Sequence, residues 1–174
     1  MKKSIKKIVL TGPESTGKST LVQQLAEHYQ TVWIPEYARM YIDNLNRPYQ
    51  QEDLLAIAKG QLEMENYLLQ YANDYIFCDT NLIVLKVWSE YKYGTCDPWI
   101  LKQIENRKYD CYVLCEIDIP WKPDHQREHP HQREELFKIY ERELLFYKKK
   151  YFKIQGTKNE RLSNVLAHLE NSIV

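Results

Sequence analysis

Short apolar runs alternate along the chain with longer segments of helical periodicity. The apolar runs predict five strands, over Lys7–Thr11, Thr31–Pro35, Tyr75–Cys78, Asp110–Glu116 and Tyr151–Gln155. The fourth run is continuously apolar between its charged ends, which favours an interior strand with both faces covered. Strands that alternate with helices in this way are typical of a parallel sheet between layers of helices.

The segments between these strands carry apolar residues at helical spacing. The longest is Glu52–Asn73, in which two neighbouring apolar stripes lie opposite a polar face that includes Lys59 and Glu63, as an amphipathic helix requires. Thr157 and Glu160 have the spacing of a capping box, which predicts the start of a last helix. Further helices are predicted from within residues 17–20 to about 29, over 82–91, and from about 131 to 148. The whole pattern predicts a three-layer α/β domain.

Composition and charge narrow the class of protein. The chain has 174 residues, 44% of them apolar, which suits one domain with one core, so we expect a single domain over residues 1–174. Lys+Arg and Asp+Glu are both 24, so no nucleic-acid or membrane-surface partner is expected. No stretch approaches the roughly 20 apolar residues of a membrane span. The four cysteines are expected to be free thiols, and the protein to be cytoplasmic.

One motif carries a specific chemical prediction. The residues from Gly12 to Thr20 fit the phosphate-loop pattern G-x-x-x-x-G-K-[ST], and they follow an apolar strand and open a helix. Gly12 permits a tight turn, and Gly17 lets backbone N–H groups surround an anion. Lys18 is expected to reach the phosphates of ATP, and the Ser19 hydroxyl to bind Mg²⁺. The expected ATP-binding residues of this loop are Gly12, Pro13, Glu14, Ser15, Thr16, Gly17, Lys18, Ser19 and Thr20.

Two carboxylates follow predicted strands at the edge of the sheet where the phosphate loop lies. Glu36 comes after the second strand and Asp79 after the third, and ligands of α/β sheets bind at this edge. We expect Asp79 to hold Mg²⁺ and Glu36 to accept the proton of the attacking hydroxyl. The two roles can also be exchanged, and either residue can instead be a plain helix N-cap.

Three arginines are candidates for stabilising the transferred phosphoryl group. Arg39 follows Glu36 closely, whereas Arg127 and Arg133 lie in or next to an irregular stretch that is rich in Pro, His and charge. We interpret this stretch, about residues 117–133, as a lid of the kind that small kinases close over their substrates. The alternative for each arginine is a surface ion pair.

The sequence resembles the ribosylnicotinamide kinase domain of the bacterial NadR proteins. The similar positions span almost the whole chain in the same order. They are Glu14-Ser15 in the phosphate loop, Glu36-Tyr37-x-Arg39, Gln61, Tyr71-Ala72-Asn73, Asp79-Thr80 and Pro120-Trp121-x-x-Asp124-x-x-Arg127. The resemblance implies a P-loop kinase fold, with a parallel sheet in the order 2-3-1-4-5. It also implies ATP-dependent phosphorylation of the 5′-hydroxyl of nicotinamide riboside, with Mg²⁺ as cofactor and nicotinamide mononucleotide as product.

The expected substrate pocket takes its residues from the same motifs. A positively charged nicotinamide ring favours an aromatic face, and Tyr37 and Trp121 are the nearest candidates. Asp124 or Gln61 is expected to bind the ribose hydroxyls or the carboxamide. The loop after the fifth strand is expected near the adenine, with Arg161 either stacked on it or exposed on the last helix.

The sequence departs from the family pattern at two places near the expected pocket. It has His125-Gln126 where the family has Gly-Leu, and Asn81 where the family tends to have an acid. A kinase for another nucleoside or small metabolite is therefore the nearest alternative function. A P-loop ATPase or GTPase without a metabolite acceptor is a further one, although the N-K-x-D motif of a GTPase is missing from the sequence.

Overall fold

Five parallel strands form the middle layer of the molecule, and the computed structural model describes residues 4–172. In chain order the elements are β1 (Lys6–Thr11), α1 (Lys18–His28), β2 (Trp33–Ile34), α2 (Tyr37–Asp43), α3 (Gln51–Leu69), β3 (Tyr75–Asp79), α4 (Leu82–Tyr93), α5 (Pro98–Asn106), β4 (Cys111–Cys115), α6 (Arg133–Phe146), β5 (Tyr151–Ile154) and α7 (Lys158–Ser172). The sheet order is β2-β3-β1-β4-β5. The predicted fold class and strand order are confirmed, and β4 lies between two strands as its apolar run indicated.

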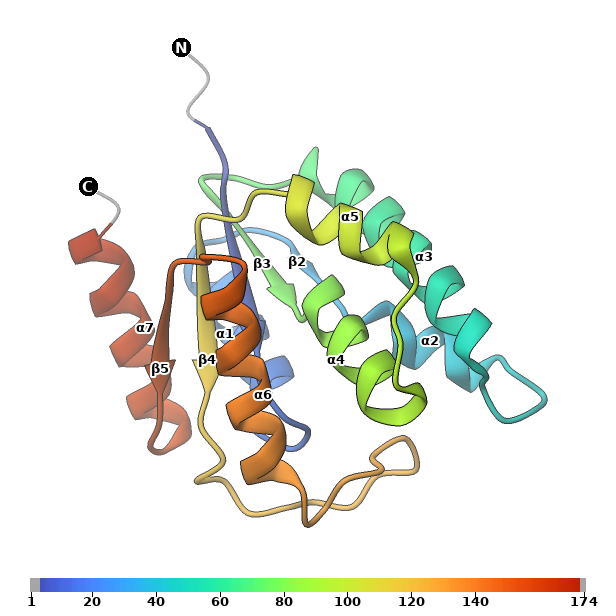
Figure 1. Cartoon of the computed structure of the whole chain (residues 1–174). Coiled ribbons are helices and arrows are strands. Elements are labelled where there is room, and N and C mark those ends of the chain that lie inside the picture. The colour runs from blue at the N-terminus through green and yellow to red at the C-terminus, as the bar shows by residue number, and fades with distance from the viewer. Residues whose placement is uncertain (1–3, 173–174) are drawn as a thin grey trace.

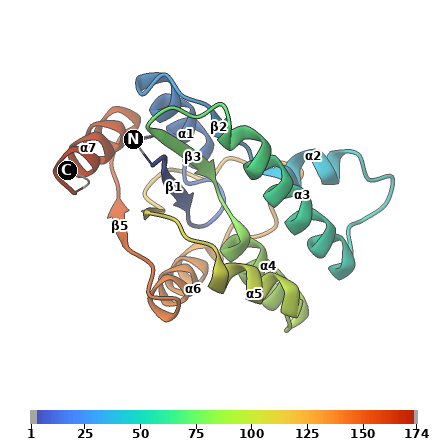
Figure 2. The same cartoon turned by 90° about the horizontal axis from the view of Figure 1, so that it is seen from above.

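The alternation of side chains along the strands divides the interior into two cores. Ile8 and Leu10 of β1 face α1 and α7, whereas Val9 between them faces the layer that contains α3, α4, α5 and α6. Figure 2 shows α1 and α7 on one side of the sheet and α4, α5 and α6 on the other. Both faces of the sheet are therefore buried, as in other α/β proteins.

The structure contains two helices that the sequence pattern did not predict, α2 and α5. Helix α2 buries only Ala38, so it has no apolar stripe to detect. Helix α5 does carry a start signal, because Asp97 is its N-cap and accepts a hydrogen bond from Trp99 N at 2.8 Å, with Pro98 in the first turn. The long helix α3 ends at Leu69, before the predicted Asn73. The backbone N–H of Asn73 instead bonds Thr31 Oγ1 at 3.0 Å.

All five strands point their carboxyl ends at one edge of the sheet. The phosphate loop leaves β1 at this edge, and residues 116–132, which connect β4 to α6, run along it (Figure 1). We call residues 116–132 the β4–α6 segment. The expected single domain over 1–174 includes residues 1–3 and 173–174, which lie outside the described residues.

Two further expectations concern cysteines and membranes. The four cysteines are free, as expected; Cys78, Cys111 and Cys115 are buried, and Cys96 is half-buried. Among the helices of residues 4–172, none has the length and apolar character needed to cross a bilayer.

Candidate active site

The phosphate loop has the backbone shape that its glycines predict. Gly12 has φ +129° and Gly17 has φ +78°, both in the region that side chains rarely adopt. A Cβ atom on Gly12 would also lie 2.9 Å from the carbonyl oxygen of Cys115 on the neighbouring strand β4. The loop closes on itself through Thr16 Oγ1, which donates to Pro13 O at 2.9 Å. The first strand, the loop and α1 therefore fit together only with glycine at position 12.

The ammonium group of Lys18 lies over this loop. Lys18 Nζ donates to Gly12 O at 2.9 Å and to Pro13 O at 2.6 Å, and both acceptors are uncharged. The positive charge of Lys18 is therefore held in place without a carboxylate bonded to it. An anion in the loop would meet this charge together with the backbone N–H groups at the start of α1.

Glu36 lies at the N-terminus of α2 and its carboxylate lines the cleft beside the phosphate loop. It is the N-cap residue by position, but its side chain makes no capping hydrogen bond, so a capping role does not explain it. Arg39 Nε lies 3.6 Å from Glu36 Oε2. Burial, followed by the negative charge of Asp79, raises the pKa of Glu36 to about 7, against the opposing charges of Lys18 and Arg39.

Asp79 ends strand β3 and is almost fully buried. Its Oδ1 has no hydrogen-bond partner among the described residues. Burial raises the pKa of Asp79, and a hydrogen bond from the Ser19 side chain opposes this effect. The helix that follows is capped by Asn81, whose Oδ1 accepts from Ile83 N at 3.1 Å, so Asp79 is not an N-cap either. Asn81, one of the two departures from the family pattern, is thus a helix cap, and its Nδ2 also donates to Tyr112 Oη at 2.9 Å. It does not line the cleft.

Gln61 does not line the cleft, contrary to its expected contact with substrate. It is buried in α3, where its Oε1 accepts from Tyr37 N at 2.8 Å and its Nε2 donates to Pro35 O at 3.2 Å. Both ends of the amide are therefore occupied by the turn that carries Glu36. The position of Glu36 depends on this contact between α3 and the turn.

Tyr37 is also outside the cleft. Its ring lies over Gly60 in α3, so closely that a Cβ atom on Gly60 would be 2.2 Å from the Tyr37 ring. The ring therefore packs α2 onto α3. The structure thus corrects the expectation that Tyr37 contacts the substrate ring, because Tyr37 does not line the cleft.

The β4–α6 segment is attached to the phosphate loop by the side chains of that loop. The Glu14 carboxylate accepts from the backbone N–H groups of Glu128 and His129, both at 3.1 Å. Ser15 Oγ accepts from Lys122 N at 2.9 Å. Arg133 Nη1 donates to Ser15 O at 3.2 Å. Arg133, expected to bind ATP, thus bonds the backbone of the phosphate loop instead of lining the cleft.

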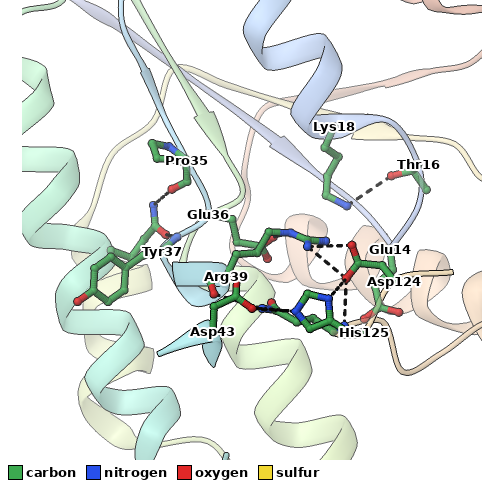
Figure 3. Close-up of polar contacts among 12 residues, drawn as sticks. Glu14, Thr16, Lys18, Pro35, Glu36, Tyr37, Arg39, Asp43, Asp124 and His125 are labelled. Atoms are coloured by element: carbon green, nitrogen blue, oxygen red, sulfur yellow. Dashed lines mark hydrogen bonds and ion pairs between the residues drawn. The ribbon is translucent and has the colours of Figure 1, made fainter. Parts of the chain in front are cut away.

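Helix α2 is attached to the same segment. Arg39 Nη1 lies 3.1 Å from Asp124 Oδ2, so Arg39 stands between Glu36 and Asp124 (Figure 3). Gln126 Nε2 donates to Asp43 Oδ1 at 2.6 Å, and Gln126 lines the cleft. Asp124, expected to bind ribose, is therefore occupied by Arg39. Of the two departures from the family pattern, only His125-Gln126 reaches the cleft.

The aromatic side chains that line the cleft are Trp88 of α4 and Tyr140 of α6. Trp121, which was expected to contact the substrate ring, does not line the cleft. Its own ring lies 6.0 Å from the guanidinium of Arg127 and 5.8 Å from that of Arg133. Sequence reasoning missed Trp88 and Tyr140 because both lie within predicted helices and outside the motifs that indicated the site. Arg127 lines the cleft as expected.

Arg161 differs most from its prediction. It is 2% exposed, so it neither stacks on a base nor faces solvent. Its guanidinium donates to Gly156 O at 2.9 Å and to Thr16 O at 2.9 Å, and it also bonds Asp118. Arg161 therefore joins the phosphate loop to the β5–α7 loop and to the start of the β4–α6 segment.

Comparison with known proteins assigns the family. A family model described as an AAA domain matches residues 7–161. The chain belongs to this family. It is also 29% identical over 126 residues to the trifunctional NAD biosynthesis/regulator protein NadR of Salmonella typhimurium, and to that of Escherichia coli by the same figures. Each match covers 69% of this chain and 30% of the relative, so the chain spans less than a third of these relatives.

Solved structures show the same fold. A NadR protein in complex with NR superimposes with a TM-score of 0.79 and 21% identity, covering 96% of this chain and 50% of that one. A NadR protein in complex with NAD and AMP-PNP gives 0.77 and 21%, covering 98% and 50%. Thymidylate kinase from Candida albicans gives 0.74 and 14%, covering 97% and 92%. The P-loop kinase fold and the resemblance to NadR that the sequence indicated are confirmed.

Proposed function

We propose that the protein transfers the γ-phosphoryl group of ATP to the 5′-hydroxyl of nicotinamide riboside, giving nicotinamide mononucleotide. The observation that carries the proposal is Glu36, a carboxylate in the cleft whose pKa is raised to about 7, beside the charge of Lys18. A base whose pKa is near the working pH suits proton removal from a hydroxyl. The similarity to NadR, one of whose structures contains NR, supports this choice of acceptor.

The phosphate end of the cleft supplies the remaining groups. Lys18 would neutralise the β- and γ-phosphates, and Arg39 and Arg127, which line the cleft, would face the transferred group. The residues fit Mg²⁺, because Asp79 has an unpartnered buried oxygen and the Ser19 hydroxyl bonds the same carboxylate. When bound, Mg²⁺ neutralises charge on the phosphates. Ser19 and Asp79 would hold it, which leaves Glu36 free to act on the acceptor.

The other end of the cleft suits a flat ring. Its wall is made by side chains of α4 and α6, namely Val84, Val87, Trp88, Leu136 and Tyr140. A cationic pyridinium ring over the face of a tryptophan gains on the order of 2 kcal/mol in a desolvated site. We therefore assign ring recognition to Trp88 and not to Tyr37 or Trp121. The β4–α6 segment hydrogen-bonds Glu14 and Ser15. It would act as the lid that is expected from the sequence at residues 117–133.

The experiment is ADP release from Mg²⁺-ATP in the presence of single acceptors. The panel is nicotinamide riboside, uridine, cytidine, thymidine and no acceptor, with the product identified by mass. We expect nicotinamide riboside to give the highest kcat/KM and its 5′-monophosphate as product. A higher kcat/KM for an uncharged nucleoside would overturn the substrate, and ADP release that no acceptor changes would indicate an ATPase.

A further inference from the structure

Tyr140 is a buried tyrosine whose hydroxyl bonds no group of the described residues. Its side chain is 6% exposed and lines the cleft from α6. Among residues 4–172 the structure contains no hydrogen bond from the Tyr140 hydroxyl to a side chain or to the backbone. The ring is thus fixed by packing, while the hydroxyl faces the space that a ligand would fill.

Other tyrosines of the same protein show what is usual. Tyr109 Oη donates to Glu65 Oε2 at 2.7 Å, and Tyr151 Oη donates to Glu141 Oε1 at 2.7 Å. Tyr112, which is 1% exposed, accepts from Asn81 at 2.9 Å. A buried hydroxyl normally finds such a partner, because an unmade hydrogen bond in a buried site is costly. The Tyr140 hydroxyl has no such partner, and it is not among the fully enclosed polar atoms that lack one, so it is open to the cleft and available to a ligand.

Building on the proposed function, we propose that the Tyr140 hydroxyl donates a hydrogen bond to an oxygen of the acceptor nucleoside, and so helps to select it. Tyr140 lines the same cleft as Val84, Val87 and Trp88, where we place the acceptor ring. Besides the ring oxygen of the ribose, the acceptor carries three oxygens that do not react, the 2′- and 3′-hydroxyls and the carboxamide oxygen. Each is an uncharged acceptor that a phenol can bond.

The electrostatic surroundings keep Tyr140 a donor. Burial raises the pKa of the Tyr140 phenol, and the negative charges of Glu36 and Glu14 raise it further. The hydroxyl therefore stays protonated at any pH at which the enzyme would work. The influence of Glu36 also places the phenol near the residue that we assign as the base.

The test is Tyr140→Phe, which keeps the ring and removes the hydroxyl. We expect the KM for nicotinamide riboside to rise about tenfold, as for the loss of one good hydrogen bond, and the KM for ATP to change less than about twofold. The stability of the free protein should not fall, because the hydroxyl has no partner to lose. The matched control is Tyr109→Phe, which should destabilise the protein by removing a donor from Glu65, and leave the KM for nicotinamide riboside unchanged.

Substrate analogues identify the oxygen. The 2′-deoxy, 3′-deoxy and carboxamide-free ribosides are compared in wild type and Tyr140→Phe. For the analogue that lacks the contacted oxygen, the ratio of the two kcat/KM values should approach one. An unchanged KM for nicotinamide riboside in Tyr140→Phe, or the same penalty on all three analogues, would overturn the proposal. If the wild type prefers another nucleoside, the proposed substrate is wrong, and the same two variants are compared on that nucleoside.

Discussion

The two ends of the cleft are built in different ways. At the phosphate end, one continuous loop supplies the groups, and these bond one another: Thr16 bonds Pro13, and Lys18 bonds the carbonyls of Gly12 and Pro13. At the acceptor end, the groups come from α2, α4 and α6, which are far apart in sequence. There the Glu36 side chain makes no capping bond, and the Tyr140 hydroxyl bonds nothing in the described part of the chain.

This difference separates two properties of one enzyme. Anion binding depends mainly on one short stretch of backbone. Acceptor choice depends on how several helices pack, and on polar groups that the protein itself leaves for a ligand. Substitutions at the two ends should therefore act on different kinetic constants.

The largest effect is expected at the phosphate end, from Lys18→Ala. The ammonium bonds only loop carbonyls and the hydroxyl of Thr16, so its loss should leave the fold intact and remove detectable transfer. Turnover and thermal unfolding are measured on the same sample. Near-wild-type turnover would contradict the assignment of the ATP site.

Glu36→Gln should affect turnover more than nucleotide binding. Loss of a general base lowers kcat by roughly 10²–10⁴-fold, whereas the dissociation constant of ATP should change little. The wild-type kcat/KM should rise with pH around a midpoint near 7, following the pKa of Glu36, and this rise should be absent in the variant. Asp79→Asn is the comparison: a deep loss of kcat there, with unchanged Mg²⁺ dependence, would exchange the roles of the two carboxylates.

A smaller effect, on selectivity, is expected from Trp88→Leu. The preference for nicotinamide riboside over uridine should fall roughly tenfold, because the cationic ring loses its aromatic face. Trp121→Leu is the matched control, since Trp121 lies by two arginines and not in the cleft. If Trp121→Leu lost the preference and Trp88→Leu kept it, the ring would bind under the β4–α6 segment.

The smallest effect concerns stability. The pKa of Glu36 is raised from 4.5 to about 7 in the folded protein, so the folded state holds a proton that the unfolded state has released between these values. Wild-type stability should therefore fall as the pH rises from 4.5 to about 7, and Glu36→Gln should escape this loss. The variant should match wild type below pH 4.5 and exceed it at about pH 8, by on the order of 1–3 kcal/mol in denaturant unfolding. Equal stabilities at pH 8 would contradict the raised pKa.

The sequence predicted the parts of the molecule that depend on local rules. Strand order, the phosphate loop and the two carboxylates at the sheet edge follow from alternation, from glycine geometry and from the direction of parallel strands. Helix α2 was missed because a single buried alanine leaves no periodic signal, whereas the Asp97-Pro98 start of α5 was readable.

The acceptor residues could not be predicted in the same way, because their roles depend on long-range packing. Gln61 and Arg161 carry polar groups that suit a ligand, yet these groups bond the backbone of distant segments. Gln61 accepts from the N–H of Tyr37, and Arg161 donates to the carbonyl of Thr16. Trp88 and Tyr140 lie within predicted helices and in no recognised motif, yet both line the cleft. Which face of a buried stripe meets a cavity is decided by how α4 and α6 pack, and this packing is not encoded in either helix alone.

The position of the proposed base depends on the absence of a Cβ atom at Gly60. A glycine inside a helix such as α3 lowers its stability by about 1 kcal/mol relative to alanine, so Gly60→Ala looks like an easy improvement for protein engineers. Here the added methyl would meet the Tyr37 ring at 2.2 Å, and Tyr37 directly follows Glu36. Sequence design that rewards helix propensity alone would favour Gly60→Ala, and the resulting clash would displace Tyr37 and the base beside it. A library built on this scaffold should hold position 60 fixed.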